Sequence, residues 1–370
     1  MTKTKDKIVR LLADADVIVG GSRPWDVQIT DERLYERVVS YGSLGLGEAY
    51  MDGWWEAERI DLMLEKVIEA DIQSKFRPDL GLIVSALKGR LINQQRLRVR
   101  EVGEKHYDTG NDLFEKMLDK RLIYSCGYWQ GAKTLDQAQE QKLDLICRKL
   151  GLEKGMTLLD IGSGWGGLMR FAAENYGVSA TGITISKEQA AYAEAHKGKL
   201  PVETRLMDYK ALTGKFDRIV SVGMFEHVGY KNYAAYMAKA RELIKPDGLF
   251  LLHSIGGNMS ATHGEPWSEK YIFPNGMLPS IRQIGAAIEG RFVMEDWHNF
   301  GADYEKTLLA WHDNFGAAWP ALKEAYGERF YRMWRYYLLS FAAMFRLRRI
   351  VLWQVVLSPN GVPGGYRSVR

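Results

Sequence analysis

The sequence predicts an α/β fold in which helices cover both faces of a seven-stranded, mostly parallel sheet, preceded by a small, mostly helical module. From about residue 101 to the C-terminus, short apolar runs alternate with amphipathic segments of helical period. This alternation is typical of a parallel sheet with crossover helices. One apolar run, residues 158–161, enters a Gly-x-Gly turn that leads into a helical pattern, which indicates a strand feeding a helix.

Each expected element rests on its own periodicity and boundary residues. The strands are expected to begin near Thr157, Ala180, Val202, Phe216, Leu249, Phe292 and Ile350. The helices are expected over residues 166–176, 187–197, 232–243, 280–288, 303–318 and 321–348, with Asp303 as the N-cap of the fifth. The carboxyl ends of parallel strands meet at one edge of a sheet, so we expect a ligand there, beside the strand that begins near Thr157.

The N-terminal part is expected to be a separate unit. Residues 1–87 read as a helical module, residues 88–100 as a basic linker without acids, and residues 101–370 as the main domain. Residues 42–47 contain three glycines, which weaken a helix, and the neighbouring Trp54 and Trp55 require burial or an interface. The pattern leaves open whether this region is a small core or a surface that faces lipid or a second subunit.

Composition excludes several classes of protein. The chain has 370 residues, of which 46% are hydrophobic and 26% charged, and its net charge of +4 does not suggest a nucleic-acid partner. Two cysteines, Cys126 and Cys147, make no disulfide framework. The N-terminus lacks the apolar core of a signal peptide, and no apolar run reaches the roughly 20 residues that a membrane-spanning helix needs. We expect a cytoplasmic protein, at most peripheral to a membrane. The seven histidines lack zinc-motif spacing, so we expect no metal.

The glycine turn after the first strand of the main domain indicates the ligand. Gly162, Gly164 and Gly167 fit the dinucleotide pattern, but no acid stands about 20 residues on at the end of the next strand, where such a site requires one. The bulky Trp165 also occupies space that a pyrophosphate would need. Asp160, directly before the glycines, favours S-adenosylmethionine instead and therefore methyl transfer.

Longer segments resemble bacterial cyclopropane-fatty-acid synthases and, more distantly, the mycolic acid cyclopropane synthases. The similar segments are residues 42–55 (GSLGLGEAYMDGWW), 106–114 (HYDTGNDLF), 124–129 (YSCGYW), 159–167 (LDIGSGWGG), 182–189 (GITISKEQ), 216–229 (FDRIVSVGMFEHVG), 251–256 (LLHSIG), 270–279 (KYIFPNGMLP), 293–311 (VMEDWHNFGADYEKTLLAW) and 352–358 (LWQVVLS). Many methyltransferases share the glycine turn, whereas YSCGYW, MFEHVG and LLHSIG together are far more specific. The resemblance covers nearly the whole chain.

This resemblance implies an activity and its partners. Residues 101–370 would form a Rossmann-like S-adenosylmethionine-dependent methyltransferase domain, and residues 1–87 a module for lipid binding or dimerisation. The methyl group of S-adenosylmethionine would become the methylene bridge across a cis double bond of a membrane phospholipid, with bound bicarbonate as the base. The family resemblance also implies a homodimer, associated peripherally with the inner face of the membrane.

The resemblance assigns five positions to bicarbonate: Cys126, Glu226, His253, Ile255 and Tyr304. The backbones of Ile255 and Cys126 would donate or orient, and His253 and Tyr304 would donate to anionic oxygens. Glu226 would accept the acidic proton of bicarbonate and hold His253 charged. Taken singly, Glu226 could be a strand-end cap and His253 a core histidine. Cys126 could be a thiolate nucleophile, although the reaction needs no covalent enzyme intermediate.

Nine positions are expected to bind S-adenosylmethionine. They are Tyr124, Ser125, Asp160, Gly162 and Gly164 for the methionine part, Thr184 and Gln189 for the ribose, and Asp208 and Tyr209 for the adenine. Tyr124 and Ser125 come from the resemblance, as positions that close over the methionine carboxylate. Asp160 is expected to face the amino group, directly or through water.

Three other functions remain open from the sequence. A fatty-acid C-methyltransferase that stops at a methyl branch would share the fold, the cofactor and the carbocation. A small-molecule N-methyltransferase is disfavoured by the N-terminal module and by residues 256–279, which could roof an acyl pocket. A catalytically silent lipid-binding module is disfavoured by the intact glycine turn together with Glu226, His253 and Tyr304.

Overall fold

The main sheet contains the seven strands that the sequence predicts, in a mostly parallel arrangement. This computed structural model describes residues 2–72 and 110–370; the expected basic linker, residues 88–100, and the boundary at residue 87 lie outside the described residues. The strands of the main sheet are β3 (Thr157–Ile161), β4 (Ser179–Thr184), β5 (Val202–Leu206), β6 (Phe216–Val222), β7 (Ile244–Gly257), β8 (Val293–Asn299) and β9 (Ile350–Ser358). Their order is β5-β4-β3-β6-β7-β9-β8, and only the pairs that involve β9 are antiparallel.

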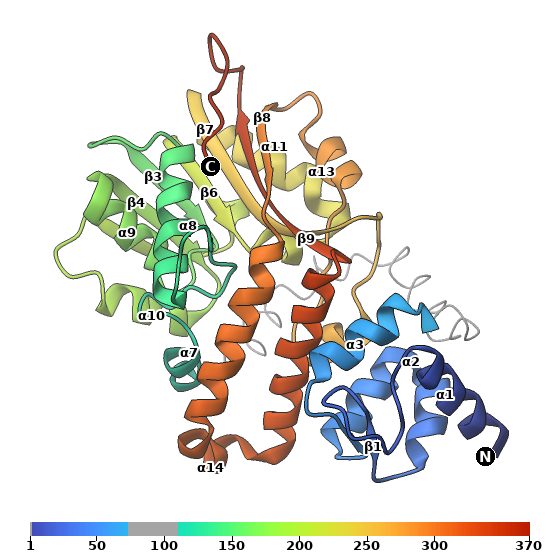
Figure 1. The fold of residues 1–370 in the computed structure, drawn as a ribbon. Helices are drawn as coiled ribbons and strands as arrows, with labels where there is room; N and C mark the ends of the chain where they lie inside the picture. The colour runs from blue at the N-terminus through green and yellow to red at the C-terminus, as the bar shows by residue number, and fades with distance from the viewer. Residues whose placement is uncertain (1, 73–109) are drawn as a thin grey trace.

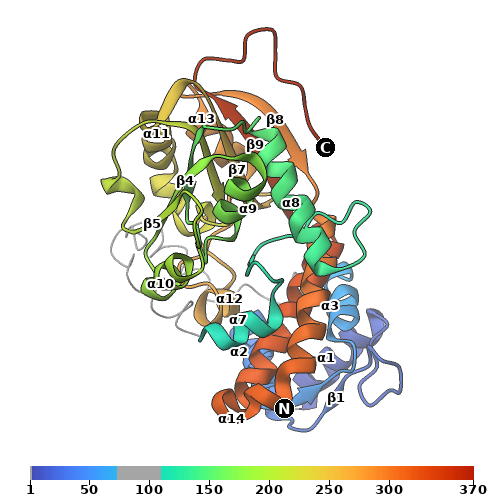
Figure 2. The same cartoon turned by 90° about the vertical axis from the view of Figure 1, so that its left-hand side faces the viewer.

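Helices cover both faces of this sheet (Figures 1 and 2). The helices of this part are α7 (Asn111–Met117), α8 (Leu135–Lys149), α9 (Gly167–Tyr176), α10 (Lys187–Ala195), α11 (Tyr233–Leu243), α12 (Pro266–Tyr271) and α13 (Ile281–Ile288), with 3-10 turns η2 (Tyr209–Ala211), η3 (Phe225–His227) and η4 (Tyr230–Asn232). Side chains alternate along a strand, so Leu158 packs with α8 and α9 while Leu159 packs with α11 and α13. The sequence analysis did not expect α7, α8 or α12.

The last helix differs from its expected form. α14 (Ala302–Arg346) runs through Pro320, where two separate helices were expected, and breaks at Gly327, whose φ is 75°. A residue without a Cβ adopts this backbone readily, so the chain reverses there and the two arms of α14 lie side by side (Figure 1). The expected N-cap was also wrong. Gly301 holds that position, and Asp303 accepts from the backbone N–H of Trp129 at 2.8 Å.

Of three N-terminal helices in the described structure, the second and third pack against α14, and the first packs on the second. They are α1 (Thr2–Asp14), α2 (Arg33–Met51) and α3 (Ile60–Glu69), with a small hairpin of β1 (Gln28–Ile29) and β2 (Trp55–Glu56). The glycine-rich stretch weakens α2 as expected: Gly42, with a φ of 55° and a ψ of −130°, is not helical and kinks the helix, which then continues through Gly45 and Gly47. Gly47 lies so close to Trp267 of α12 that a Cβ atom would stand 2.4 Å from the indole, which explains the missing side chain.

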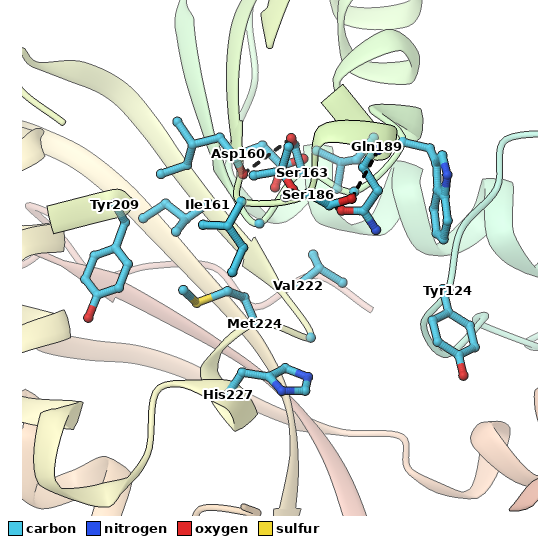
Figure 3. A pocket seen from close by; sticks show the side chains of 18 of the residues that line it. Tyr124, Asp160, Ile161, Ser163, Ser186, Gln189, Tyr209, Val222, Met224 and His227 are labelled. Carbon is cyan, nitrogen blue, oxygen red and sulfur yellow. Dashed lines mark hydrogen bonds between the residues drawn. The ribbon is translucent and has the colours of Figure 1, made fainter. Parts of the chain in front are cut away.

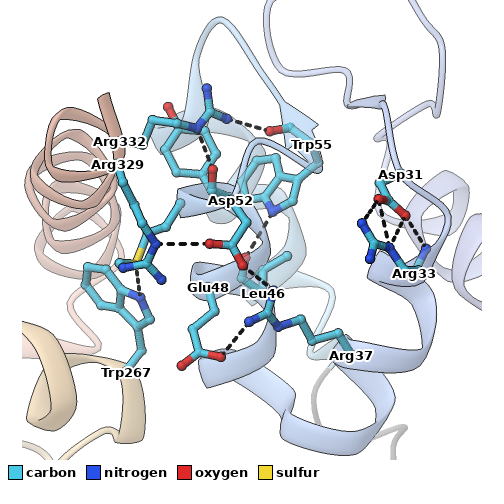
Figure 4. A network of polar contacts seen from close by, with 12 residues as sticks. Asp31, Arg33, Arg37, Leu46, Glu48, Asp52, Trp55, Trp267, Arg329 and Arg332 are labelled. Atoms are coloured by element: carbon cyan, nitrogen blue, oxygen red, sulfur yellow. Dashed lines mark hydrogen bonds and ion pairs between the residues drawn. The ribbon is translucent and has the colours of Figure 1, made fainter. Parts of the chain in front are cut away.

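Ion pairs, one of them buried, join these helices to α14. Asp61, which is fully buried, pairs with Arg346 at 2.8 Å, and Asp52 pairs with Arg329 at 3.1 Å (Figure 4). The sequence left open whether this region is a small core or an exposed surface. Trp55 is fully buried and therefore belongs to a core, whereas Trp54 lies under the guanidinium of Arg37. No helix within the described residues is both long enough and apolar enough to cross a bilayer.

Candidate active site

A pocket opens at the carboxyl ends of β3, β4 and β6, the edge where the ligand was expected (Figure 3). All nine residues predicted to bind the cofactor line it: Tyr124, Ser125, Asp160, Gly162, Gly164, Thr184, Gln189, Asp208 and Tyr209. They come from the ends of three strands, β3, β4 and β5, and from the loop after α7. Their convergence follows from the parallel order of the strands, because each carboxyl end reaches the same edge.

The glycine turn lies in the left-handed region of backbone space. Gly162 has a φ of 87°, and a Cβ atom there would stand 2.8 Å from the Cβ of Met224. Gly164 has a φ of 54°. Both the conformation and the space therefore require glycine at residue 162, and the bare backbone lets a ligand approach the start of α9.

The polar groups along the pocket are held by their own hydrogen bonds. The hydroxyl of Thr184 donates to Gln189 Oε1 at 3.0 Å, which fixes the two side chains expected at the ribose. Asp208 accepts from the backbone N–H of Lys210 at 2.9 Å. The ring of Tyr209 packs edge-on against Tyr236, with 5.0 Å between centroids, so it forms part of the pocket wall.

Three ionisable residues that line the pocket were not predicted from the sequence: Lys142, His227 and the exposed Lys210. Lys142 of α8 is 1% exposed, and its Nζ donates to Ser125 Oγ at 2.9 Å. The signal was available: Lys142 follows Leu135 by seven residues and Ala138 by four, so a cation stands on the apolar face of a helix. His227 also lines the pocket, and burial lowers its pKa to about 4.

Asp160 is buried at the base of the pocket. Burial raises its pKa to about 7, and the charge of Lys142 acts in the opposite direction. A carboxyl group with this pKa is easily converted to the carboxylate by an approaching cation. The position and the chemistry both suit an ammonium group such as that of the methionine part.

The five residues expected to hold bicarbonate lie beside this pocket and do not line it. Glu226 belongs to η3, directly before His227, and its Oε1 accepts from the backbone N–H of Ile255 at 2.7 Å. The other oxygen, Oε2, is buried and has no hydrogen-bond partner among the described residues. Burial raises the pKa of Glu226 to about 7. The amide of Ile255 therefore orients Glu226.

His253 lies on β7 in the same buried region. Its Nδ1 is 3.2 Å from the amide nitrogen of Gln354, which in this orientation leaves the ring proton on Nε2. Nε2 is buried without a partner in the described structure. Burial lowers the pKa of His253 well below its usual value, which favours the neutral imidazole while no anion is bound; the charged imidazole expected beside bound bicarbonate stays a prediction.

Cys126 and Tyr304 are brought together by a loop that packs on α14. The backbone N–H of Gly127 donates to the hydroxyl of Thr307 at 3.0 Å, one helical turn from Tyr304. The thiol of Cys126 donates to the carbonyl of Gly127 at 3.1 Å, and burial raises its pKa well above the usual value, which disfavours a thiolate nucleophile. The ring of Tyr304 stacks on Phe345 with 4.4 Å between centroids.

The sheet order, the glycine turn and the acid before it define an S-adenosylmethionine-dependent methyltransferase. A solved mycolic acid cyclopropane synthase, CmaA1 in complex with SAH and CTAB, is 34% identical, with a TM-score of 0.65 over 70% of this chain and 98% of that one. Cyclopropane-fatty-acyl-phospholipid synthase of Escherichia coli K12 is 50% identical over 97% of this chain and 94% of its own.

A further relative and a family model complete the comparison. A probable fatty acid methyltransferase of Pseudomonas putida is 39% identical over 68% of this chain and 67% of its own. The model of the mycolic acid cyclopropane synthetase family matches residues 94–355. The chain belongs to this family.

Proposed function

We propose that this enzyme transfers the methyl group of S-adenosylmethionine as a methylene bridge onto the cis double bond of an unsaturated phospholipid acyl chain, which forms a cyclopropane ring. The proposal is supported by the 50% identity to a cyclopropane-fatty-acyl-phospholipid synthase over nearly the whole chain. The observation that carries it is the pair of unpartnered polar atoms, Glu226 Oε2 and His253 Nε2, buried beside the cofactor pocket. A methyltransferase without a deprotonation step has no need of such a pair.

The chemistry requires a dry, aromatic environment. Attack of the alkene on the sulfonium methyl group places positive charge on the acyl chain, and π-faces stabilise that charge. Tyr124 of the pocket packs on Trp311 of α14, with 5.1 Å between ring centroids, and its hydroxyl bonds to that of Tyr337 at 3.0 Å. Tyr337 in turn packs edge-on against Phe273 at 5.6 Å. These rings form an aromatic wall between the pocket and α14.

The five residues expected to hold bicarbonate, here called the candidate bicarbonate site, fit this anion. Bicarbonate, when bound, supplies the base for the proton that leaves as the ring closes. Glu226 Oε2 would accept the acidic proton of this anion, and His253 Nε2–H would donate to an anionic oxygen. The neutral state of His253 keeps that donor without adding a buried charge. Ile255 holds Glu226 in place, and Tyr304 and the Cys126 loop close the site on the α14 side.

One surface of the described structure suits contact with an anionic bilayer. The Met259 surface consists of Met259, Ile281, Arg282, Arg348 and Arg349. Met259 is 82% exposed and Ile281 58% exposed, and the three arginines have no ion-pair partner among the described residues. Apolar side chains beside cations are the combination that an interfacial membrane contact requires.

Hydrogen bonds fix the loop that presents Met259. The side-chain amide of Asn258 donates to the carbonyl of Arg348 at 2.8 Å, and the hydroxyls of Ser260 and Ser280 bond at 2.7 Å. The loop is therefore tied to the end of α14 on one side and to the start of α13 on the other. The residues exposed there are held in one position. Dimer formation and location at the inner face of the membrane stay predictions.

The decisive experiment is mass spectrometry and proton NMR of lipids after the purified enzyme acts on vesicles of cis-monounsaturated phospholipid with S-adenosylmethionine. We expect a gain of one CH2 unit, loss of the vinyl proton signals and appearance of cyclopropane signals. A gain with vinyl or branched-methyl signals would favour the alternative, a fatty-acid C-methyltransferase, which the P. putida relative suggests. No gain despite measured binding of S-adenosylmethionine would contradict action on phospholipids.

A further inference from the structure

The cofactor pocket contains a buried cation that neither its motifs nor the family resemblance assigns to a role. Lys142 stands in the middle of α8, is 1% exposed and lines the pocket. Removing an ammonium group from water is unfavourable by several kcal/mol unless a partner compensates. A buried lysine at this position therefore needs a partner group that compensates for the loss of water.

The protein supplies only part of that compensation. The hydrogen bond from Lys142 Nζ to the neutral hydroxyl of Ser125, 2.9 Å long, is its contact in the described structure, and no carboxylate there forms an ion pair with it. Asp119 and Asp160 act on Lys142 only at longer range, and burial lowers its pKa to about 8. The side chain thus brings a positive charge to the pocket that is not neutralised by a neighbouring residue.

The ligand of this pocket carries the complementary charges. The methionine part of S-adenosylmethionine is a zwitterion, with an ammonium group and a carboxylate on one carbon atom. Asp160, close to the glycine turn, suits the ammonium group, whereas Ser125 and Lys142 line the pocket from other elements, the loop after α7 and α8. Because Ser125 Oγ already accepts from Lys142, its own hydroxyl proton is free to point into the pocket as a donor.

We propose that Lys142 binds the carboxylate of the methionine part of S-adenosylmethionine, by its charge and by orienting the hydroxyl of Ser125 as a donor to that carboxylate. A charge-assisted hydrogen bond in a water-poor pocket is stronger than a neutral one. The pair Asp160 and Lys142 then recognises both charges of the amino acid end. This inference rests on the use of S-adenosylmethionine and is independent of the acceptor lipid.

The test compares two ligands that differ in the carboxylate alone. Isothermal titration calorimetry with S-adenosylmethionine and with decarboxylated S-adenosylmethionine gives the preference of each variant for the carboxylate. We expect Lys142→Met to weaken binding of S-adenosylmethionine about tenfold to a hundredfold and to change binding of the decarboxylated ligand by less than about threefold. Ser125→Ala should reduce the same preference while Lys142 remains.

The chain offers a matched control. Lys149 lies seven residues further along α8, is also fully buried, and does not line the pocket. Lys149→Met should leave the preference between the two ligands unchanged. Equal weakening of both ligands by Lys142→Met would overturn the proposal in favour of a general structural role. Should that variant fail to fold, equal affinity of the wild-type enzyme for the two ligands, or an unchanged preference in Ser125→Ala, would overturn it as well.

Discussion

Burial decides the charge of each ionisable group in the candidate bicarbonate site. It raises the pKa values of Glu226 and Cys126 and lowers that of His253, so the carboxyl group, the thiol and the imidazole all tend toward their neutral forms. The hydrogen bond from the backbone N–H of Ile255 stabilises the carboxylate of Glu226, but less than burial disfavours it. Glu226 Oε2 and His253 Nε2, which have no hydrogen-bond partner among the described residues, suit a small anion that brings its own proton, whereas the thiol of Cys126 already donates to the carbonyl of Gly127.

Removal of the acceptor or donor groups of this site should reduce turnover. Glu226→Gln and Tyr304→Phe are each expected to reduce turnover by roughly 100-fold, the scale of a misplaced acid–base group, while the dissociation constant of S-adenosylmethionine changes little. Steady-state assays on vesicles and calorimetry would measure the two quantities. Tyr336→Phe, in another buried tyrosine of α14, is the control and should retain activity. Turnover near wild type in both site variants would refute the site.

The raised pKa of Glu226 makes a second prediction, on stability. The folded protein holds this proton more tightly than the unfolded chain, whose carboxyl group titrates near 4.5, so the stabilisation is present at low pH and is lost as the pH rises to about 7. Its size is on the order of 3 kcal/mol. The free energy of unfolding of wild type relative to Glu226→Gln should fall by that amount between pH 4.5 and 7. Urea denaturation without bicarbonate measures it, and a difference that is independent of pH would contradict the assignment.

At the scale of helices and strands, close packing explains why a glycine stands where α2 meets α12. After its kink at Gly42, α2 resumes a helical course, and there Gly47 lets the fully buried indole of Trp267 approach the backbone. The indole N–H of Trp267 also reaches the sulfur of Met51 at 3.4 Å. Residues 256–279, expected to roof an acyl pocket, thereby connect the neighbourhood of Glu226 to the N-terminal helices: the backbone N–H of Met277 donates to the carbonyl of Glu226 at 2.9 Å.

A methyl group at this contact should be destabilising. Gly47→Ala is expected to lower the free energy of unfolding by roughly 1–3 kcal/mol, because the new Cβ atom would overlap the indole of Trp267 and force α2 and α12 apart. Gly316→Ala is the matched control. Gly316 lies inside α14 with no atom within 4 Å of a new Cβ, so this substitution should stabilise the helix by up to about 1 kcal/mol. Equal effects of the two substitutions would contradict the packing argument.

On the scale of the whole molecule, α14 joins the sheet to the N-terminal helices. Its first turn carries Tyr304 and holds the Cys126 loop, and its second arm pairs through Arg346 with the buried Asp61 of α3 (Figures 1 and 2). The expected N-terminal module therefore shares its core with a helix that closes the candidate bicarbonate site. We infer that disturbance of the N-terminal helices reaches the site through α14.

The Met259 surface should control vesicle binding. Replacement of Arg348 and Arg349 by glutamine is expected to weaken binding to anionic vesicles at low salt about tenfold or more, since each cation near a bilayer contributes about 1 kcal/mol. Met259→Ser should weaken binding further, and by an amount that salt does not screen. Vesicle sedimentation measures both effects. Lys323→Gln, an exposed cation elsewhere on α14, is the control, and an equal loss there would show that only net charge matters.

The sequence by itself determined the sheet and the glycine turn, and it predicted nine cofactor-binding residues that line one pocket at the carboxyl edge of that sheet. These features are local: the period of two in a strand, the backbone freedom of glycine and the carboxyl end of each strand depend on residues adjacent in the chain. Tertiary structure alone decided the neutral state of His253, the reversal of α14 at Gly327 instead of Pro320, and the arrival of Lys142 at the pocket. Each depends on burial by segments distant in the sequence, and the free energy of a buried charge or a close contact is set by those neighbours.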